Sequence, residues 1–464
     1  MASKKPVQSN AWRIKPSERR FLLFLVDLIV TVASLVLAMY IWSRADPRFT
    51  FNWEFVLTQP PTWYFFLPVL WLLLLSELYD NRRSNRLPEV LKGIGMAVAV
   101  SAIIYLGIFF LSKPNSLPRL GVAFFFLFAA FFTLSWRLIY IRIFTAPSFM
   151  RRMLVVGAGR AGSELVTIIK GLWPQPFYLV GYIDDDENKQ GSEVAGLTVL
   201  GGGKDLLQLI DEYHVSDIIF AISGEMQDDT FKALLTAEEN GAEITTMPVV
   251  YEQLLGRVPI FLLPSDWVLR SFVDAAHSAG AYELGKRLLD LLGSLVGLLI
   301  LAFFMPLISL AILLDSGGPV LYSQIRMGKN NRPYNIIKFR TMRKDAESDG
   351  VARPAAENDQ RVTRVGRILR RSHLDELPQF INVLKGEMSL VGPRPERPEL
   401  IEKLQTKVPF YRARQFVKPG VTGWAQVNFH YASTVEDTAV KLEYDLYYIK
   451  HRNLLLDITI LIRT

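Results

Sequence analysis

Residues 288–314 read LLDLLGSLVGLLILAFFMPLISLAILL, a long apolar stretch that Pro306 interrupts near its middle. Cationic residues flank it on both sides: Lys286 and Arg287 before it, then Arg326, Lys329 and Arg332 after it. Because cationic loops favour the cytoplasmic side of a membrane, a helix that crossed here would place one cluster on the wrong side. A proline also bends a helix, because it removes a backbone hydrogen bond. We therefore predict that residues 286–314 enter one leaflet and return, which keeps residues 315–464 cytoplasmic; a true membrane span is the alternative.

Four further apolar segments lie in the first third of the chain, each near the length of about twenty residues that crosses hydrocarbon. They cover approximately residues 21–42, 63–79, 90–111 and 120–144. Cations gather before the first segment, between the second and third, and after the fourth, so both ends of this transmembrane domain (residues 1–150) are predicted to face the cytoplasm. The first segment is too long for a signal peptide and lacks a cleavage site, so we expect it to be retained. Asp27 lies inside it, and we interpret this residue as interfacial or helix-pairing.

Composition narrows the chemistry. The chain has 464 residues, room for about three domains, and a net charge of +7. Together with the apolar segments, this charge favours an anionic membrane surface as partner over nucleic acid. The chain has no cysteine, which excludes disulfides, thiolate catalysis, iron–sulfur clusters and cysteine zinc sites. Its five histidines include no His-x-x-x-His pair, which argues against a transition-metal enzyme.

Residues 151–265 have the pattern of a Rossmann-like α/β domain, and residues 266–281 are a predicted linker. A short apolar strand at 153–156 precedes a GxGxxG turn formed by Gly157, Gly159 and Gly162. Asp184 ends a second strand, where an acid could bind a ribose. A domain of this size supplies only one mononucleotide-binding half, however. We therefore expect a regulatory or dimerising module and no nucleotide cofactor, although these four residues are the ones that would bind it.

Candidate phosphate-binding residues concentrate in the last third of the chain. A strand predicted at 334–342 places Lys338 and Arg340 on one face, where they could grip a diphosphate, although cations that protect an edge strand follow the same pattern. Arg394 stands between two prolines, and a rigidly held arginine suits bidentate phosphate recognition. Residues 418–428 are predicted to form a polar loop suited to a nucleotide or sugar, with these candidate contacts: Lys418, Gly420, Thr422, Gln426 and Asn428.

The adjacent acids Asp375 and Glu376 follow a run of arginines at residues 361–371. Neighbouring cations favour the ionised form of a carboxyl group, which suits an anionic nucleophile or a metal ligand near phosphate. The alternative is a solvated helical face with ion pairs three and four residues apart, and the segment taken by itself favours that alternative.

Six ordered motifs make residues 282–464 resemble the bacterial sugar transferase family, the monotopic phosphoglycosyl transferases. The motifs are Lys286-Arg287-x-x-Asp290, Gly317-Gly318-Pro319, Lys338-Phe339-Arg340-Thr341-Met342, Leu374-Asp375-Glu376-Leu377-Pro378-Gln379, Ser389-Leu390-Val391-Gly392-Pro393-Arg394-Pro395 and Lys418-Pro419-Gly420. The apolar segments and the Rossmann-like domain resemble the long form of the family. This form comprises the polyprenyl-phosphate hexose-1-phosphate transferases that initiate exopolysaccharide, capsule or O-antigen synthesis.

The resemblance implies a reaction and roles for individual residues. Such enzymes move a sugar-1-phosphate from a UDP-sugar to undecaprenyl phosphate, release UMP and require Mg²⁺. By resemblance, Asp375 attacks the β-phosphate to give a covalent phosphosugar–aspartate intermediate, and Glu376 is its partner as base or metal ligand. Positions around the family's phosphate and metal site are matched by Arg370, Gln379 and Arg394. Pro306 follows Met305 where many members have Ser-Pro at the break of the re-entrant helix.

The expected architecture is therefore a membrane α-helical bundle plus α/β domains. It has four transmembrane helices, a Rossmann-like cytoplasmic domain and a C-terminal α/β catalytic domain (residues 282–464) with a re-entrant membrane hairpin. The expected location is the bacterial inner membrane, with the soluble domains on the cytoplasmic side. The expected partners are a UDP-sugar, undecaprenyl phosphate and the lipid bilayer, and a homodimer follows only by analogy. The sequence of residues 423–426, Gly-Trp-Ala-Gln, favours glucose over galactose as the sugar. A segment beyond Thr464 is expected to be missing.

Two rival functions are weaker. A membrane-anchored NAD-dependent nucleotide-sugar dehydratase or epimerase would need a complete Rossmann domain with a Tyr-x-x-x-Lys pair on a later helix. The pair Tyr282 and Lys286 has that spacing but lies beside the apolar stretch, so we interpret it as a coincidence. A ligand-sensing channel would need a pore signature such as Thr-Val-Gly-Tyr-Gly, which the sequence lacks.

Overall fold

The computed structural model describes residues 16–45, 49–79, 81–111, 119–144, 150–173, 175–222, 224, 226–263, 280–343, 346, 359–429 and 434–464. The chain divides into two compact units, Met1–Met247 and Pro248–Thr464. Most of the predicted linker, residues 266–279, lies outside the described residues.

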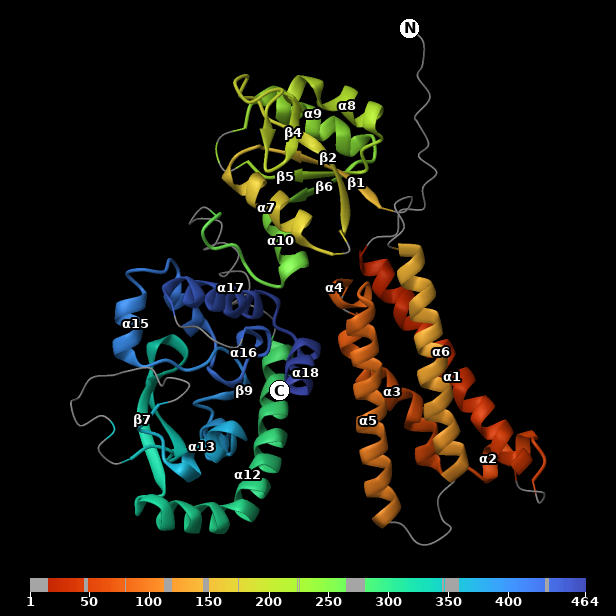
Figure 1. Ribbon diagram of the computed structural model, residues 1–464, viewed down its shortest axis with the longest axis vertical. Helices are drawn as coiled ribbons and strands as arrows, with labels where there is room; N and C mark the ends of the chain where they lie inside the picture. Colours follow the sequence, from red (N-terminus) through yellow and green to blue (C-terminus); the bar gives the residue numbers. More distant parts are fainter. Residues whose placement is uncertain are drawn as a thin grey trace. The chain divides into compact units, whose positions relative to one another are not determined.

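Three long apolar helices build the membrane part of the first unit: α1 (Pro16–Ala45), α5 (Leu87–Leu111) and α6 (Arg119–Phe144). Figure 1 shows α6 packed along α1 and beside α5. Within the described residues, these three helices and α12 (Gly280–Ser316) of the second unit are long and apolar enough to cross a membrane. The chain is thus a membrane protein by the length and composition of its helices.

The predicted second span, residues 63–79, is broken into three pieces. A 3-10 turn, η1 (Thr62–Phe66), leads into α3 (Leu67–Leu74), and a second 3-10 turn, η2 (Ser76–Tyr79), follows. Prolines lie where the first two of these pieces begin: Pro61 precedes η1, and Pro68 occupies the first turn of α3. The apolar helix is therefore shorter than the single span that we predicted. Short helices α2 (Trp53–Thr58) and α4 (Asn81–Ser84) flank this region.

A buried ion pair joins α1 to α6. Arg137 Nη2 lies 2.5 Å from Asp27 Oδ2, and both side chains are fully buried. Arg137 Nη1 also donates to the carbonyl of Leu78 at 3.0 Å. Asp27 is thus a helix-pairing residue, one of the two interpretations drawn from the sequence.

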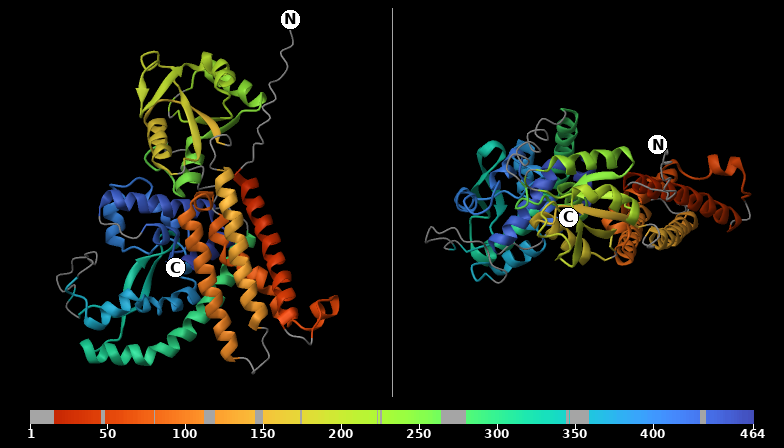
Figure 2. Two further views of the ribbon diagram at one scale, coloured as in Figure 1. Left: turned by 45° about the vertical axis from the view of Figure 1, so that its right-hand side comes forward. Right: turned by 90° about the horizontal axis from the view of Figure 1, so that it is seen from above.

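The Rossmann-like domain is a six-stranded sheet in the order β3-β4-β2-β1-β5-β6, parallel except for the β3–β4 pair. Its strands are β1 (Arg151–Val156), β2 (Phe177–Ile183), β3 (Glu193–Val194), β4 (Leu197–Gly201), β5 (Asp217–Phe220) and β6 (Glu243–Thr246). The helices are α7 (Arg160–Gly171), α8 (Leu206–Tyr213) and α9 (Asp228–Glu239). Figure 2 shows the sheet with its helices from two further directions.

The glycine turn after β1 has a local structural reason. Gly157 has a φ of +109°, a conformation that side chains disfavour. A Cβ added at Gly162 would stand 2.0 Å from the carbonyl oxygen of Gly157, so the close approach of α7 to the turn requires glycine. Packing therefore explains Gly157 and Gly162 whether or not a ligand binds, whereas a Cβ added at Gly159 would have no neighbour within 4 Å.

The second unit starts with most of α10 (Met247–Leu255). It continues with α12, which contains Pro306 and is followed by the antiparallel hairpin β7 (Leu321–Met327) and β8 (Pro333–Phe339). Figure 1 shows that α12 turns sharply along its length before the chain reaches β7. Many apolar side chains of α12 are exposed, among them Phe303 at 79% and Leu307 at 66%. A bent apolar helix is what a re-entrant hairpin needs, and the depth of insertion stays a prediction.

The rest of the second unit is mainly helical and surrounds a parallel two-stranded sheet, β9 (Ser389–Val391) with β10 (Gly420–Thr422). Its helices are α13 (Arg364–Arg371), α14 (Gln379–Lys385), α15 (Pro398–Leu404), α16 (Trp424–Asn428), α17 (Val435–His451) and α18 (Leu454–Arg463). The 3-10 turn η6 (Leu374–Glu376) lies between α13 and α14, and η7 (Tyr411–Phe416) follows α15; a further turn, η5 (Lys329–Asn331), joins β7 to β8. One core cluster, with Met388, Val391, Trp424 and Leu446 at its centre, holds these elements together.

Candidate active site

The acid pair is not part of the basic helix. Thr363 begins α13 by accepting a hydrogen bond from Gly366, and the helix ends at Arg371. His373 then adopts a left-handed conformation with φ +55°, which redirects the chain into η6. Asp375 in this turn is only 8% exposed. This burial contradicts the alternative of a solvated helical face.

Two cations hold Glu376. Lys338 Nζ from β8 donates to Glu376 Oε1 at 2.8 Å, and Arg394 Nη2 donates to the same oxygen at 3.0 Å. Burial by itself raises the pKa of Glu376, but Arg394 and Lys338 outweigh it and lower the pKa to about 2. Glu376 is therefore ionised at any physiological pH.

Asp375 has a different environment. Among the described residues, none forms a hydrogen bond or ion pair with its carboxylate. Burial, followed by the negative charge of Glu376, raises the pKa of Asp375, and Lys338, Arg370 and Arg394 offset only part of this. The site thus contains two different carboxylates. Asp375 is buried and has no partner among the described residues, whereas Glu376 is paired with both Lys338 and Arg394. An unpaired carboxylate beside cations is suited to attack a phosphoryl group.

The other predicted phosphate-binding residues, Arg370, Gln379 and Arg340, differ in their position relative to the acid pair. Arg370 lies close enough to influence the pKa of Asp375, and its Nε donates to Thr341 Oγ1 at 2.9 Å. Gln379 is 2% exposed, and its Nε2 has no hydrogen-bond partner within the described part of the chain. Arg340 points elsewhere: its Nη2 donates to the Ser316 hydroxyl at 2.9 Å and to the carbonyls of Ser316 and Gly317.

Arg340 therefore closes the C-terminal end of α12 instead of joining Lys338 at the acids. The strand β8 ends at Phe339, and the Arg340 side chain is engaged by the backbone and hydroxyl at the end of α12 instead of by the acids. The structure brings together Asp375, Glu376, Lys338 and Arg394, with Arg370 nearby.

The predicted loop at 418–428 is largely regular structure. Gly420 and Thr422 belong to β10, and Gln426 and Asn428 belong to α16. Three of the side chains bond within the domain: Thr422 Oγ1 to Thr464 Oγ1 at 2.7 Å, Gln426 Nε2 to the Val421 carbonyl at 3.2 Å, and Asn428 Nδ2 to the Trp424 carbonyl at 2.8 Å. Lys418 lines a separate pocket of about 140 Å³ with Lys286, Asp290 and Lys329.

Tyr282 and Lys286 share one structural partner. Tyr282 OH donates to Asp457 Oδ2 at 3.1 Å, and Lys286 Nζ lies 3.0 Å from Asp457 Oδ1. Lys286 also donates to the Val391 carbonyl at 2.9 Å and so ties α12 to β9. The Tyr-x-x-x-Lys spacing thus belongs to a packing contact outside the Rossmann-like sheet, as interpreted from the sequence.

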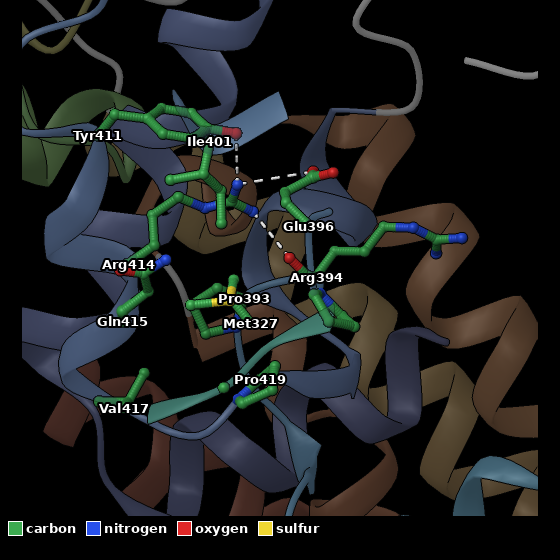
Figure 3. Close-up of a pocket in the computed structure, with 12 residues that line it drawn as sticks. Met327, Pro393, Arg394, Glu396, Ile401, Tyr411, Arg414, Gln415, Val417 and Pro419 are labelled. Carbon is green, nitrogen blue, oxygen red and sulfur yellow. Dashed lines mark hydrogen bonds and ion pairs between the residues drawn. The ribbon is translucent and has the colours of Figure 1, made fainter. Parts of the chain in front are cut away.

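Sequence reasoning missed a buried charge cluster behind Arg394. Figure 3 shows Arg414 between Tyr411, Glu396 and the backbone of Arg394, around a small cavity of about 20 Å³. Lys441 lies 3.0 Å from Glu396, and Asp445 lies 2.9 Å from Arg414. Burial alone raises the pKa of Glu396, but Lys441 and Arg414 lower it to about 2. No local sequence pattern marks Arg414, because its partners come from distant segments.

The glycine turn of the Rossmann-like domain borders a pocket of about 360 Å³ lined by Gly157, Gly159, Asp184 and Lys189, among others. Asp184 Oδ2 accepts from the backbone of Ala158 at 2.8 Å and from Lys189 at 3.1 Å. Gly162 faces the turn and not the pocket. Asp184 Oδ1 accepts from the backbone of Asp186 at 3.0 Å, so the carboxylate predicted to meet a ribose already has three partners.

The residues at the acid pair can share a magnesium ion with a substrate. Within the described residues, no three His, Asp or Glu side chains gather into a site that could hold a metal ion by itself. Mg²⁺ is commonly held by one or two carboxylates together with substrate phosphates and water. Asp375 and the second oxygen of Glu376 fit that role.

Comparison with known proteins places these observations in a family. Residues 281–464 match the family model of the bacterial sugar transferases, which confirms the resemblance seen in the motifs. Residues 75–248 match a family model described as a CoA-binding domain, in agreement with the Rossmann-like fold.

Curated relatives agree with the first match. One is an undecaprenyl-phosphate glucose phosphotransferase of Komagataeibacter xylinus, 35% identical over 68% of this chain and 58% of that protein. Another is a UDP-N-acetylgalactosamine-undecaprenyl-phosphate N-acetylgalactosaminephosphotransferase of Aeromonas hydrophila, 41% identical over 46% of this chain and 49% of that protein. The chain thus spans about half the length of these two relatives. It covers 78% of a UDP-glucose:undecaprenyl-phosphate glucose-1-phosphate transferase of Caulobacter vibrioides at 41% identity.

Proposed function

Because this chain belongs to the bacterial sugar transferase family, we propose that it transfers a hexose-1-phosphate from a UDP-sugar to undecaprenyl phosphate and releases UMP. The observation that carries the proposal is the buried carboxylate of Asp375, which has no partner among the described residues and lies beside Glu376, whose charge Lys338 and Arg394 neutralise. This transfer would be the first membrane step of polysaccharide synthesis.

The chemistry would proceed in two displacements. In the first, an Asp375 oxygen attacks the β-phosphorus of the UDP-sugar, the bond from that phosphorus to the bridging oxygen breaks, and UMP leaves. In the second, a phosphate oxygen of the lipid attacks the same phosphorus, and the bond to Asp375 breaks to restore the carboxylate. Two displacements let a soluble donor and a lipid acceptor use one site in turn.

The neighbouring residues would neutralise charge and hold the substrate. Lys338, Arg370 and Arg394 carry cations that act on the acids and are suited to the phosphate oxygens. Gln379 has a buried amide donor that a substrate oxygen could satisfy. Mg²⁺, which the resemblance implies, would be held by Asp375 and Glu376 and would supply further charge neutralisation at the phosphates.

The membrane arrangement follows from α12. We propose that its bent apolar helix dips into the cytoplasmic leaflet and returns, which places the acid pair at the level of the lipid phosphate. The exposed leucine and phenylalanine side chains of α12 and the cations at both of its ends support this placement. The catalytic domain and the Rossmann-like domain would both lie in the cytoplasm.

The covalent scheme is tested with full-length protein and UDP-glucose labelled in the β-phosphate, without lipid. We expect label on the wild-type protein and none on the Asp375→Ala variant. Absence of label on the wild type, or label that survives Asp375→Ala, would refute the covalent intermediate. Release of UDP instead of UMP after addition of undecaprenyl phosphate would indicate an ordinary glycosyltransferase.

The sugar is tested separately. Relatives act, by their names, on either glucose or N-acetylgalactosamine derivatives. We propose UDP-glucose as the donor, in line with residues 423–426. The test compares the rates of UMP release from UDP-glucose, UDP-galactose and UDP-N-acetylgalactosamine. Faster release from either of the last two than from UDP-glucose would correct this assignment.

A further inference from the structure

Hydrogen bonds to four consecutive backbone carbonyls hold the segment that contains Arg394. The carbonyls of Pro393, Arg394, Pro395 and Glu396 accept, in that order, from the Gly420 backbone at 2.9 Å, Arg414 Nη2 at 3.0 Å, Arg326 Nη1 at 3.2 Å and the Met327 backbone at 3.1 Å. The donors come from β10, η7 and β7, which are far apart in the sequence. Because two of these four residues are prolines with restricted φ, the backbone here has little freedom left.

Arg414 is itself held from three directions. Its Nη1 donates to Tyr411 OH at 2.8 Å and lies 3.5 Å from Glu396 Oε1, and its Nε forms an ion pair with Asp445 at 2.9 Å. Its side chain is only 7% exposed. A planar guanidinium can meet these partners and still donate to the Arg394 carbonyl, whereas a lysine ammonium cannot reach all of them.

The Arg394 side chain leaves this cluster on the opposite side. Figure 3 shows its guanidinium pointing away from Arg414, while its carbonyl faces Arg414. The same guanidinium reaches Glu376 at 3.0 Å, next to Asp375. One residue therefore connects the buried cluster, through its backbone, to the acid pair, through its side chain.

We propose that Arg414 is a positioning residue for the transfer reaction, holding the Arg394 backbone so that the Arg394 guanidinium stays on Glu376. This inference rests on the proposed function for its effect on rate, but the geometry itself can be tested without activity. The competing explanation is that Arg414 only balances the buried charges of Glu396 and Asp445 and so stabilises the fold.

The variant of choice is Arg414→Lys, because it keeps a positive charge between Glu396 and Asp445 and loses the fork that reaches the Arg394 carbonyl. Arg412→Lys is the matched control, since Arg412 is exposed in the same turn η7. Thermal melting of the full-length protein in detergent establishes that both variants are folded. If Arg414→Lys is not folded, Tyr411→Phe replaces it, because that change removes only one of the groups that orient Arg414.

The rate experiment is a double-mutant cycle on UMP release from UDP-glucose. We expect Arg414→Lys to lower kcat/KM about 100-fold, the order of loss that misplacement of a catalytic group by about 1 Å produces, and Arg412→Lys to leave it unchanged. In an Arg394→Gln background, we expect Arg414→Lys to have less than a twofold effect, because the group that it positions is gone. Full additivity of the two changes, or wild-type kcat/KM in folded Arg414→Lys, would overturn the proposal.

The geometric experiment measures how fast phenylglyoxal modifies Arg394, by peptide mass spectrometry. We expect faster modification in Arg414→Lys than in the wild type and Arg412→Lys, because the Arg394 guanidinium leaves Glu376. An unchanged rate would show that Arg414 does not hold Arg394. If the wild type released no UMP from any UDP-sugar, the proposed function would fail, and this experiment would still decide the positioning role.

Discussion

At the scale of single residues, two adjacent carboxylates have opposite electrostatic environments. Glu376 accepts hydrogen bonds from Lys338 and Arg394, and its pKa is lowered, whereas the pKa of buried Asp375 is raised. Groups whose environments move their pKa values apart commonly have different catalytic roles. In the proposed mechanism, Asp375 is the nucleophile and Glu376 holds the cations of Lys338 and Arg394 in place.

The pH dependence of Glu376→Gln tests this assignment. Asp375 must be ionised to act, so activity falls as the pH drops through the pKa of Asp375. Removing the negative charge of Glu376 lowers the pKa of Asp375, and we expect the acidic limb of the kcat/KM profile to move to lower pH. UMP release measured between about pH 4 and 8 provides the profile, because the ordinary carboxyl pKa is about 4.

The control for this profile is Glu402→Gln, since Glu402 is exposed on α15. We expect its acidic limb to coincide with that of the wild type. A limb that moved to higher pH in Glu376→Gln, or did not move, would show that Asp375 does not govern the acidic limb.

At the scale of elements, close backbone contact explains several glycines better than ligand binding does. A Cβ at Gly420 would stand 2.1 Å from the backbone nitrogen of Gly392, and one at Gly423 would stand 2.2 Å from its carbonyl oxygen. The β9–β10 pair therefore depends on glycine for its approach. This pair also aligns the start of the segment that carries Arg394.

We predict that Gly420→Ala destabilises the second unit by about 1–3 kcal/mol, the usual cost of an overpacked site. Gly280→Ala is the control, because a Cβ there has no neighbour within 4 Å. Chemical denaturation of the two variants measures the difference. Normal stability of Gly420→Ala with a raised KM for the UDP-sugar would instead support a direct role of Gly420 in the nucleotide site.

The bend of α12 leads to a topology prediction. Leu284 and Leu321 lie at the first turns of α12 and just after its end, and both are exposed. Since the chain has no cysteine, Leu284→Cys and Leu321→Cys can be labelled one at a time with a membrane-impermeant maleimide. We expect both cysteines to react in inside-out inner-membrane vesicles. We expect neither to react in intact cells whose outer membrane has been made permeable to the maleimide. Labelling of Leu321→Cys from the outer side would show that α12 crosses the membrane.

At the scale of the whole molecule, a fully buried charged pair, Asp27 and Arg137, joins α1 to α6 inside the apolar bundle of the first unit. Breaking a buried pair leaves an isolated charge, whereas replacing both partners by apolar residues removes the burial cost of both. The pair therefore sets which faces of α1 and α6 meet.

We predict that Asp27→Ala lowers the stability of the bundle by about 3–5 kcal/mol, because it leaves Arg137 buried and unpaired. The double variant Asp27→Leu with Arg137→Met should regain most of the loss. Thermal melting in detergent measures both. A double variant no more stable than Asp27→Ala would show that packing, and not the lone charge, causes the loss.

Much of the site could be predicted from the sequence because its groups lie in short, recognisable strings. Asp375, Glu376 and Arg394 were all marked by local pattern. Arg340 was misplaced by the same method, because its side chain bonds to the end of α12 instead of to the acids. The second apolar segment likewise has the length and composition of a full span, but prolines at its start lead to shorter pieces.

The sequence by itself determined where three long apolar helices of the first unit form, where the glycine turn lies and which adjacent carboxylates are the candidates for the chemistry. These properties depend on composition and spacing within a few residues of the chain. Only the tertiary structure decided that Lys338 and Arg394 meet on Glu376, that Asp375 has no hydrogen-bond or ion-pair partner among the described residues, and that Arg414 donates to the Arg394 carbonyl. The physical reason is that a hydrogen bond or ion pair acts over about 3 Å, so its partners depend on how distant segments pack and not on their order in the chain.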